Sequence, residues 1–233
     1  MDLHPLAIGT AATALAAGFA FVYWRYVWFF RNPPRSPPRH EGILSPADGT
    51  VVYVRKVAAD EPVISVKRGV QIRVPDILRG DLGGTCLVIG VFMSPFDVHY
   101  NRAPVDGRVV SVRHYPATGR NLHMGSMHLR TLLKRPPYHA GSLHIGRNER
   151  SVTRIEGLYG GRALPCYVVQ IAGGSVRGID SYVAEGQSIQ RGAAFGMIRV
   201  GSQVDTILPW MDDMEIRVHP GQKVRAGETL LVT

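Results

Sequence analysis

The stretch that decides the fold reads GMIRVGSQVDTILP and spans residues 196–209. Two apolar, β-branched runs, 196–200 and 204–208, flank the pair Gly201-Ser202, and Pro209 closes the second run. Runs of this kind, bounded by glycine and proline, predict strands joined by a tight turn. Similar runs recur at 49–57, 63–66, 85–93, 107–114, 167–171, 193–200 and 229–232. We therefore expect a mainly β domain with a sandwich-like or barrel-like architecture.

Two segments near the C-terminus form an internal quasi-repeat. EGQSIQRGAAFG at 185–196 and PGQKVRAGETLL at 220–231 share a Gly-Gln pair, an apolar residue two positions later and a second glycine. The same cadence occurs in biotinyl-type and lipoyl-type β-sandwiches, where it is purely structural. Residues 114–150, rich in Arg, His, Gly and Pro, interrupt the strand pattern and are expected to form an irregular loop over the site.

The pair Gly201-Ser202 has two interpretations. Gly-Ser is most often a plain turn. The second interpretation is chemical: glycine permits backbone conformations closed to other residues, so the Ser202 hydroxyl can approach the carbonyl carbon of Gly201. Attack there gives an ester by an N→O acyl shift. β-Elimination and hydrolysis then leave a pyruvoyl group at the new N-terminus, and such a ketone condenses with amines and acts as an electron sink.

The N-terminal stretch PLAIGTAATALAAGFAFVYW, residues 5–24, contains no charged residue. A helix of this length spans about 30 Å, which matches the hydrocarbon core of a bilayer. An aromatic belt and a series of arginines flank its end: Tyr23, Trp24, Tyr26, Trp28, Arg25, Arg31, Arg35 and Arg39. This pattern favours a membrane anchor over a buried helix, and the lack of Lys or Arg before the stretch argues against a cleaved signal peptide. We expect the arginine side to face the cytoplasm.

The composition is consistent with one sizeable core behind this anchor. The 233-residue chain has 45% hydrophobic residues and a formal net charge of +9. A basic balance suits anionic lipid headgroups or nucleic acid, and because no nucleic-acid-binding motif is found in the sequence, we expect lipid and no nucleic acid. Cys86 and Cys166 each lie in an apolar run and are expected to be buried, reduced thiols.

Five motifs follow one another along the chain: FFRNPPR at 29–35, LSPADGTV at 44–51, FMSPFDVHYNRAPVDG at 92–107, RNERS at 147–151 and GSQVD at 201–205. Together they resemble the phosphatidylserine decarboxylase proenzymes, specifically the short bacterial and archaeal form. The resemblance covers most of residues 29–233. It implies self-cleavage between Gly201 and Ser202, a covalent pyruvoyl group derived from Ser202, and no pyridoxal phosphate or metal. It also implies decarboxylation of phosphatidylserine to phosphatidylethanolamine through a Schiff base, with the small chain 202–233 bound to the large chain 1–201.

Three further residues acquire roles from the same motifs. His99 is expected to act as the base for Ser202 or to move protons at the substrate. Asp48 is expected to orient His99 in the manner of a Ser-His-Asp triad, although a hairpin turn is the simpler role of an Asp-Gly pair. Longer relatives carry a second histidine three residues after the first, and this chain has Arg102 there. His99 must therefore substitute for it, and Arg102 is expected to bind the substrate phosphate or carboxylate.

The other histidines of 114–150 include His123, His128, His139 and His144. The segment HMGSMH lacks the third ligand and carboxylate typical of a metal site, so we expect polar loop residues.

Two alternatives to a phosphatidylserine decarboxylase remain open from the sequence. One is a pyruvoyl decarboxylase of another amino-acid-like substrate. The other is a non-enzymatic, membrane-tethered adaptor with a lipoyl-like β-sandwich, which the lack of a suitable lysine at a hairpin tip disfavours as a carrier. In either case we expect an anchor and juxtamembrane segment at 1–34 and one domain at 35–233, on the cytoplasmic face of the cell membrane. A homo-oligomer is compatible with the sequence.

Overall fold

The computed structural model describes residues 5–58, 60–66, 70–80, 82–174, 178–199 and 201–233. The chain divides into two compact units, Met1–Pro33 and Pro34–Thr233. Residues 1–4 of the expected anchor and Val200, the last residue of a predicted strand, lie outside the described residues.

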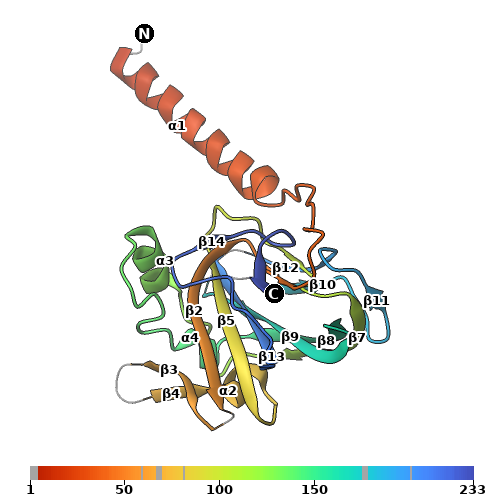
Figure 1. Ribbon diagram of the computed structural model, residues 1–233. Coiled ribbons are helices and arrows are strands. Elements are labelled where there is room, and N and C mark those ends of the chain that lie inside the picture. Colours follow the sequence, from red (N-terminus) through yellow and green to blue (C-terminus); the bar gives the residue numbers. More distant parts are fainter. Residues whose placement is uncertain (1–4, 59, 67–69, 81, 175–177, 200) are drawn as a thin grey trace. The chain divides into compact units, whose positions relative to one another are not determined.

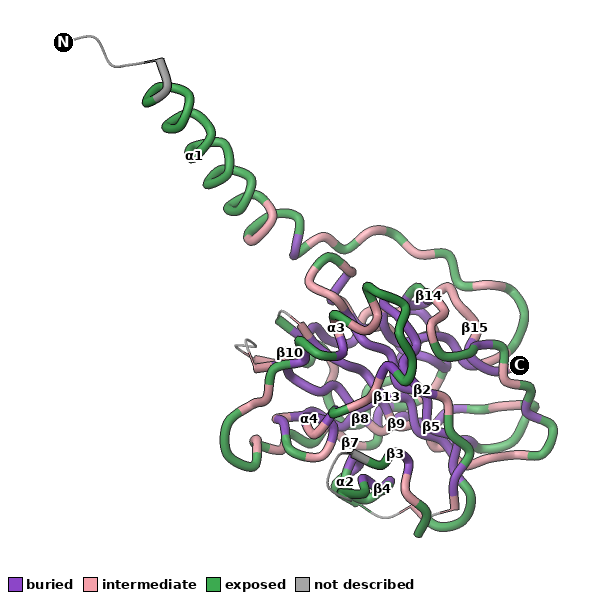
Figure 2. Tube along the Cα trace, turned by 90° about the vertical axis from the view of Figure 1, so that its left-hand side faces the viewer, coloured by how far each residue is buried: buried purple, intermediate pink, exposed green. Residues whose placement is uncertain are grey.

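The N-terminal unit is helical. Helix α1 spans Pro5–Tyr23 and is followed by the π-helical turn η1 at Trp24–Trp28. Most residues of α1 are exposed (green in Figure 2). The window Ala7–Trp28 has a mean hydropathy of 1.5, none of it is buried, and it is long and apolar enough to cross a membrane. The predicted N-terminal apolar helix is therefore confirmed, and the lack of burial distinguishes it from the core helix of a globular domain.

The second unit is built on one curled sheet of eight antiparallel strands (Figure 1). The order across the sheet is β11-β7-β8-β9-β13-β5-β2-β14. In the same order these strands span Ser188–Ile189, Gly107–Tyr115, Arg150–Tyr159, Arg162–Ala172, Ser202–Pro209, Thr85–Met93, Gly49–Ala58 and Lys223–Val224. The mainly β fold that the strand pattern predicts is confirmed, and the predicted strand at 204–208 proves to begin two residues earlier, at Ser202 itself.

Smaller elements complete the domain. A three-stranded sheet joins β10 (Ile179–Ser181), β12 (Ala194–Ile198) and β6 (Tyr100–Arg102), and two pairs are formed by β1 (Ile43–Leu44) with β15 (Leu230–Val232) and β3 (Pro62–Val66) with β4 (Val70–Arg73). The helices are α2 (Val74–Leu78), α3 (Gly125–Leu132) and α4 (His144–Arg147). The prediction of an irregular loop at 114–150 is thus wrong in part, because α3 and α4 lie within it.

Both faces of the large sheet are covered, so its central strands read as continuous apolar runs. Every residue of β13 except Pro209 is buried. Successive side chains point to opposite faces: Val204 and Leu208 pack in one core cluster with Val91, and Ile207 packs in a second cluster with Val88. Ser202 shares the first face with Val204, and Gln203 shares the second with Ile207.

The quasi-repeat folds into two equivalent units. In one, the Gly192 amide donates to the Ala103 carbonyl (2.8 Å); in the other, the Gly227 amide donates to the Ser45 carbonyl (2.9 Å). Each of these carbonyls opens a Pro-x-Asp-Gly turn, at 103–107 and at 45–49. The turn aspartates are held alike: Asp106 accepts from the Arg191 amide (2.9 Å) and Asp48 from the Ala226 amide (2.7 Å). Asp48 and Asp106 therefore occupy equivalent structural positions.

Candidate functional site

Ser202 is the first residue of β13, the strand between β5 and β9. It is paired with Met93 on one side and with Ala172 on the other, and its side chain is fully buried. Gly201, just before it, adopts a left-handed conformation with φ +60, which disfavours residues with a Cβ. The chain therefore turns sharply at Gly201-Ser202 on its way from β12 in one sheet to β13 in the other.

The carbonyl of Gly201 is held by a close approach to Gly173, the residue after β9. A Cβ placed on Gly173 would overlap the Gly201 carbonyl oxygen. At Gly201 itself a Cβ would meet nothing within 4 Å, so only the backbone conformation selects glycine there. The two glycines thus act on the same peptide bond in different ways, one through φ and the other through the space that its missing side chain leaves.

The Ser202 hydroxyl is linked through Met93 to the buried side-chain amides of Asn101 and Gln170. Ser202 Oγ donates to Met93 Sδ at 3.4 Å, and Asn101 Nδ2 approaches the same sulfur at 3.7 Å. Asn101 Oδ1 in turn accepts from Gln170 Nε2 at 2.8 Å. All four side chains are fully buried. The sequence motifs gave no role to Asn101 or Gln170, although Asn101 lies within the motif at 92–107.

His99 is fully buried just before β6, at the start of the segment that leads to Asn101. Its backbone carbonyl accepts a hydrogen bond from the Ile198 amide at 3.3 Å. His99 therefore lies against the last residue of β12, the strand that precedes the Gly-Ser turn in the sequence. Its Nδ1 is 2.9 Å from the Asp97 carbonyl. Because a carbonyl only accepts hydrogen bonds, Nδ1 carries the proton, and in the neutral ring Nε2 is the basic nitrogen.

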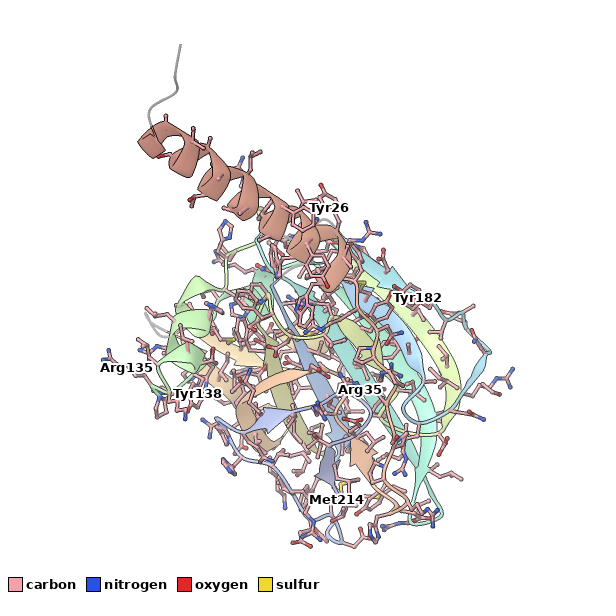
Figure 3. The ribbon with its side chains drawn as sticks, turned by 90° about the horizontal axis from the view of Figure 1, so that it is seen from above. Tyr26, Arg35, Arg135, Tyr138, Tyr182 and Met214 are labelled. Carbon is pink, nitrogen blue, oxygen red and sulfur yellow. The ribbon has the colours of Figure 1, made fainter. Side chains whose placement is uncertain are left out.

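Asp48 lies in a different set of contacts. Its Oδ2 accepts from Arg35 Nη2 at 2.7 Å, and its Oδ1 accepts from the Ala226 amide. Arg35 is almost completely buried and also pairs with Glu228 at 3.2 Å (Figure 3 labels Arg35). Arg102 donates to the Gly192 carbonyl at 2.9 Å, and burial together with the nearby Arg35 lowers its pKa. The roles of Asp48 toward His99 and of Arg102 toward a substrate stay predictions.

A cavity of about 240 Å³ borders the Gly-Ser turn. Its lining comprises Phe92, Pro95, His123, Met124, Gly125, His128, Gly173, Gly174 and Gly201. Four of these residues come from the segment 114–150, so this segment does contribute to a wall beside Gly201. The His128 ring packs against the Phe92 ring, with centroids 5.9 Å apart. A larger hollow of about 780 Å³, near Arg39 and Arg191, does not include Gly201, Ser202 or His99 in its lining.

A second buried polar cluster lies on the other face of β13. Gln203 Nε2 donates to Asp205 Oδ1 and to Tyr53 Oη, both at 2.7 Å, and Tyr53 Oη donates to Asp205 Oδ2 at 2.8 Å. His144 Nε2 is 3.1 Å from Gln203 Oε1. Burial raises the pKa of Asp205 to about 6 and lowers the pKa of His144 to about 4. Nothing in the sequence motifs pointed to this cluster except Gln203 and Asp205 in GSQVD.

Both cysteines are buried and form no disulfide. Burial raises the pKa of the Cys166 thiol to about 12, so the thiol is chemically inert at neutral pH. Among the residues that the structure describes, no group of three or more His, Cys, Asp or Glu side chains is placed to hold a metal ion.

The fold and this site define a class of protein: a β domain with a buried serine directly after a left-handed glycine, beside a cavity, and attached to an apolar helix. The phosphatidylserine decarboxylase family profile matches residues 22–232. The phosphatidylserine decarboxylase proenzyme of Pelobacter propionicus is 34% identical over 98% of this chain and 87% of its own length. That of Symbiobacterium thermophilum is 34% identical over 95% of this chain and 89% of its own length.

A protein of Methanothermobacter thermautotrophicus, provisionally named archaetidylserine decarboxylase proenzyme, is 36% identical over 87% of this chain and 78% of its own length. The chain therefore belongs to the phosphatidylserine decarboxylase family of carboxy-lyases. The resemblance that the five motifs indicated is confirmed.

The contact between Gly173 and Gly201 yields a testable prediction. If the chain cleaves itself at Gly201-Ser202, as the resemblance implies, Gly173→Ala should block or strongly slow the cleavage, because the new Cβ displaces the Gly201 carbonyl. Gly174→Ala is the matched control: the atoms nearest to its Cβ would be those of the exposed His123 ring, which can move aside. A time course of intact mass after synthesis measures both. Equal cleavage of the two variants would contradict the proposed role of the contact.

The cluster around Asp205 predicts two opposite pH dependences. His144 has a folded pKa of about 4, below its ordinary 6.5, so the folded state binds fewer protons between these values and His144 makes stability rise with pH. Asp205 has a folded pKa of about 6, above its ordinary 3.8, so it makes stability fall with pH over nearly the same window. Each slope is roughly 1 kcal/mol per pH unit.

Removal of one group should expose the slope of the other. As the pH increases from 4 to 6, the thermal midpoint of His144→Gln should fall relative to that of the wild type. Over the same range the thermal midpoint of Asp205→Asn should rise relative to that of the wild type. Thermal unfolding of the detergent-solubilised chain across this range measures both variants. Parallel curves for the two variants would show that these groups do not titrate as described.

Proposed function

We propose that this chain cleaves itself between Gly201 and Ser202 and then decarboxylates phosphatidylserine to phosphatidylethanolamine. The observation that carries the proposal is the placement of Ser202: buried, first in a doubly paired strand, and directly after a left-handed glycine whose peptide bond borders a cavity. The family membership supplies the reaction class, and the geometry supports the site at which it occurs.

The surroundings of Ser202 fit the formation of a pyruvoyl group there. The hydroxyl is held on the core face by Met93 and lies beside the peptide bond that it must attack. In cleavage Oγ bonds to the Gly201 carbonyl carbon while the peptide C–N bond breaks; elimination then frees the Gly201 carboxylate, and hydrolysis releases ammonia. Once formed, a pyruvoyl group supplies an electron sink for the loss of carbon dioxide from an amino acid headgroup.

The two products of cleavage should remain together. The segment 202–233 contributes β13, which pairs with β9 and with β5, and β15, which pairs with β1. Val204, Leu208 and Leu231 lie in the same core cluster as residues of 1–201. Separation would expose this core to water, so the small chain is expected to stay bound to the large chain.

The other residues are assigned by their motifs, their hydrogen bonds and the lining of the cavity. His99 is proposed as the base, through Nε2, for the proton of Ser202. Asn101 and Gln170 are proposed to position the Met93 side chain against which Ser202 packs. The proposal that Arg102 binds the substrate rests on its motif alone, since Arg102 is not among the residues that line the 240 Å³ cavity. His123 and His128 line that cavity and are better placed to contact a headgroup.

The apolar helix supports a location at the membrane, where a lipid substrate resides. We propose that α1 anchors the chain and that the arginines after it place the domain on the cytoplasmic face. This keeps 1–34 as the anchor and juxtamembrane segment and 35–233 as the decarboxylase domain.

Archaetidylserine is the second candidate substrate, because relatives with that provisional name are as similar as the bacterial ones. Both names include a serine headgroup. Parallel assays with the two lipids in matched vesicles decide between them.

Maturation gives the most direct test of this function. The purified wild type should show two masses, corresponding to 1–201 and to 202–233 with a blocked N-terminus. Ser202→Ala should remain one uncut chain without decarboxylase activity, because alanine has no hydroxyl. Intact-mass spectrometry and release of carbon dioxide from carboxyl-labelled phosphatidylserine measure these outcomes. An active wild type that is still full length would falsify the pyruvoyl assignment.

The equivalence of Asp48 and Asp106 gives a matched test of the proposed triad. Both aspartates hold a backbone amide in the same kind of turn, but only Asp48 also pairs with Arg35, so Asp48→Asn should cost more stability than Asp106→Asn. If Asp48 also supports the base, only Asp48→Asn should slow cleavage. His99→Gln should slow it further, by about 10²–10⁴-fold, the usual contribution of a general base. Cleavage at the wild-type rate in His99→Gln would remove His99 from the mechanism.

A further inference from the structure

Helix α3 presents apolar side chains to water. Met127 is fully buried and attaches the helix to the domain, whereas Leu129, Leu132 and Leu133 are 55%, 69% and 48% exposed. Their spacing of three and four residues places them on one side of the helix and its C-terminal turn. Single exposed leucines are ordinary on protein surfaces, but three that are adjacent on one short element form a patch that calls for a partner.

The charge around this patch has one sign. Residues 107–148 contain no Asp or Glu, and Lys134 and Arg135 follow the leucines directly and are exposed. Arg135 extends outward at the edge of the domain next to α3 (Figure 3). Arg130 donates to the carbonyls of Arg135 and Pro137, which holds this turn in place. Exposed leucines beside lysine and arginine are the combination that binds an anionic bilayer surface.

The patch lies on the helix that contributes part of the lining of the 240 Å³ cavity. Gly125 and His128 of α3 line the cavity from one side, and Pro95 lines it from another. Phe96, next to Pro95, is 65% exposed. Exposed apolar residues therefore adjoin the cavity lining in sequence at two places, Leu129 next to His128 and Phe96 next to Pro95. A tether alone confines a domain near a membrane but does not turn its opening toward the lipid, so a second contact beside the cavity has a mechanical role.

We propose that residues 129–135 of α3 and its following turn, together with Phe96, form a docking surface for an anionic lipid bilayer that presents the cavity to lipid headgroups. The proposal rests on the proposed function for its lipid substrate. The leucines and Phe96 enter the interface between headgroups and acyl chains, and Lys134 and Arg135 lie at the level of the phosphates.

A fluorescent label tests the docking without any use of turnover. The native cysteines are buried, so a new surface cysteine can be labelled selectively. The full chain carrying Leu132→Cys, or Leu158→Cys as the control, is labelled with an environment-sensitive fluorophore and reconstituted in phosphatidylcholine vesicles with or without phosphatidylglycerol. Leu158 is 68% exposed, on β8, and matches Leu132 in residue type and exposure. Quenching by a lipid-attached nitroxide is then measured.

We expect strong quenching at position 132, weak quenching at position 158, and a larger difference when phosphatidylglycerol is present. Equal quenching at the two positions would overturn the proposal. An unquenched label at 132 in both vesicles would also overturn it and would indicate a protein as the partner. Phosphatidylglycerol has no serine headgroup, so this result stands even if the chain has no activity on phosphatidylserine.

Turnover provides the second arm. The triple variant Leu129→Ser/Leu132→Ser/Leu133→Ser is compared with Leu158→Ser on phosphatidylserine in vesicles and on short-chain phosphatidylserine in detergent. The ratio of vesicle to detergent turnover should fall by about tenfold or more in the triple variant, because the three leucine side chains can no longer be buried in the bilayer. In the control the ratio should stay at the wild-type value. An unchanged ratio in the triple variant would overturn the docking surface. A wild type inactive on both substrates would overturn the proposed function instead.

Discussion

The two-sided hydrogen-bond ladder of β13 is the constraint on which the rest of the structure depends. Because the ladder begins at Ser202, the peptide bond before it lies at the boundary between regular pairing and a free turn. Ser202 is thereby fixed, whereas Gly201 takes up the left-handed conformation and places its carbonyl against Gly173. A serine one residue further along the strand would point to the opposite face, away from Met93. The position of Gly201-Ser202, the proposed cleavage site, is thus set by strand pairing.

The polar groups on the far face of β13 fit the same register. Gln203 and Asp205 are buried, and their hydrogen bonds are made to Tyr53 and His144. A slip of one residue would move Gln203 and Asp205 into the apolar cluster that holds Val204, at the cost of unsatisfied buried polar groups. Tyr53 reaches Asp205 because its ring lies over Gly90, where a Cβ would overlap it. The hydrogen bonds of this cluster therefore help to hold Ser202 on the opposite face of the strand.

The internal repeat explains why Asp48 can be interpreted either as a structural turn residue or as a partner of His99. Asp48 and Asp106 both close a Pro-x-Asp-Gly turn against a Gly-Gln hairpin, which is a structural task. Asp48 differs in its ion pair with the buried Arg35, which comes from the motif at 29–35. This ion pair fixes Arg35, the last residue of that motif, to the turn that Asp48 closes.

The sequence by itself determined the elements and the family: period-two runs between glycines and prolines predicted the strands, an uncharged run predicted the apolar helix, and five ordered motifs indicated the phosphatidylserine decarboxylases. These features are local, and each can be recognised within a few residues. Only the tertiary structure decided which strands flank β13, and hence that Gly173, Asn101 and Gln170 lie beside Ser202. It also revealed α3 and α4, which are too short for a helical period to be evident, and gave Asp48 its partner Arg35. These contacts join segments distant in sequence, and the sheet order that brings them together follows from packing both faces of one curled sheet, which no local pattern encodes.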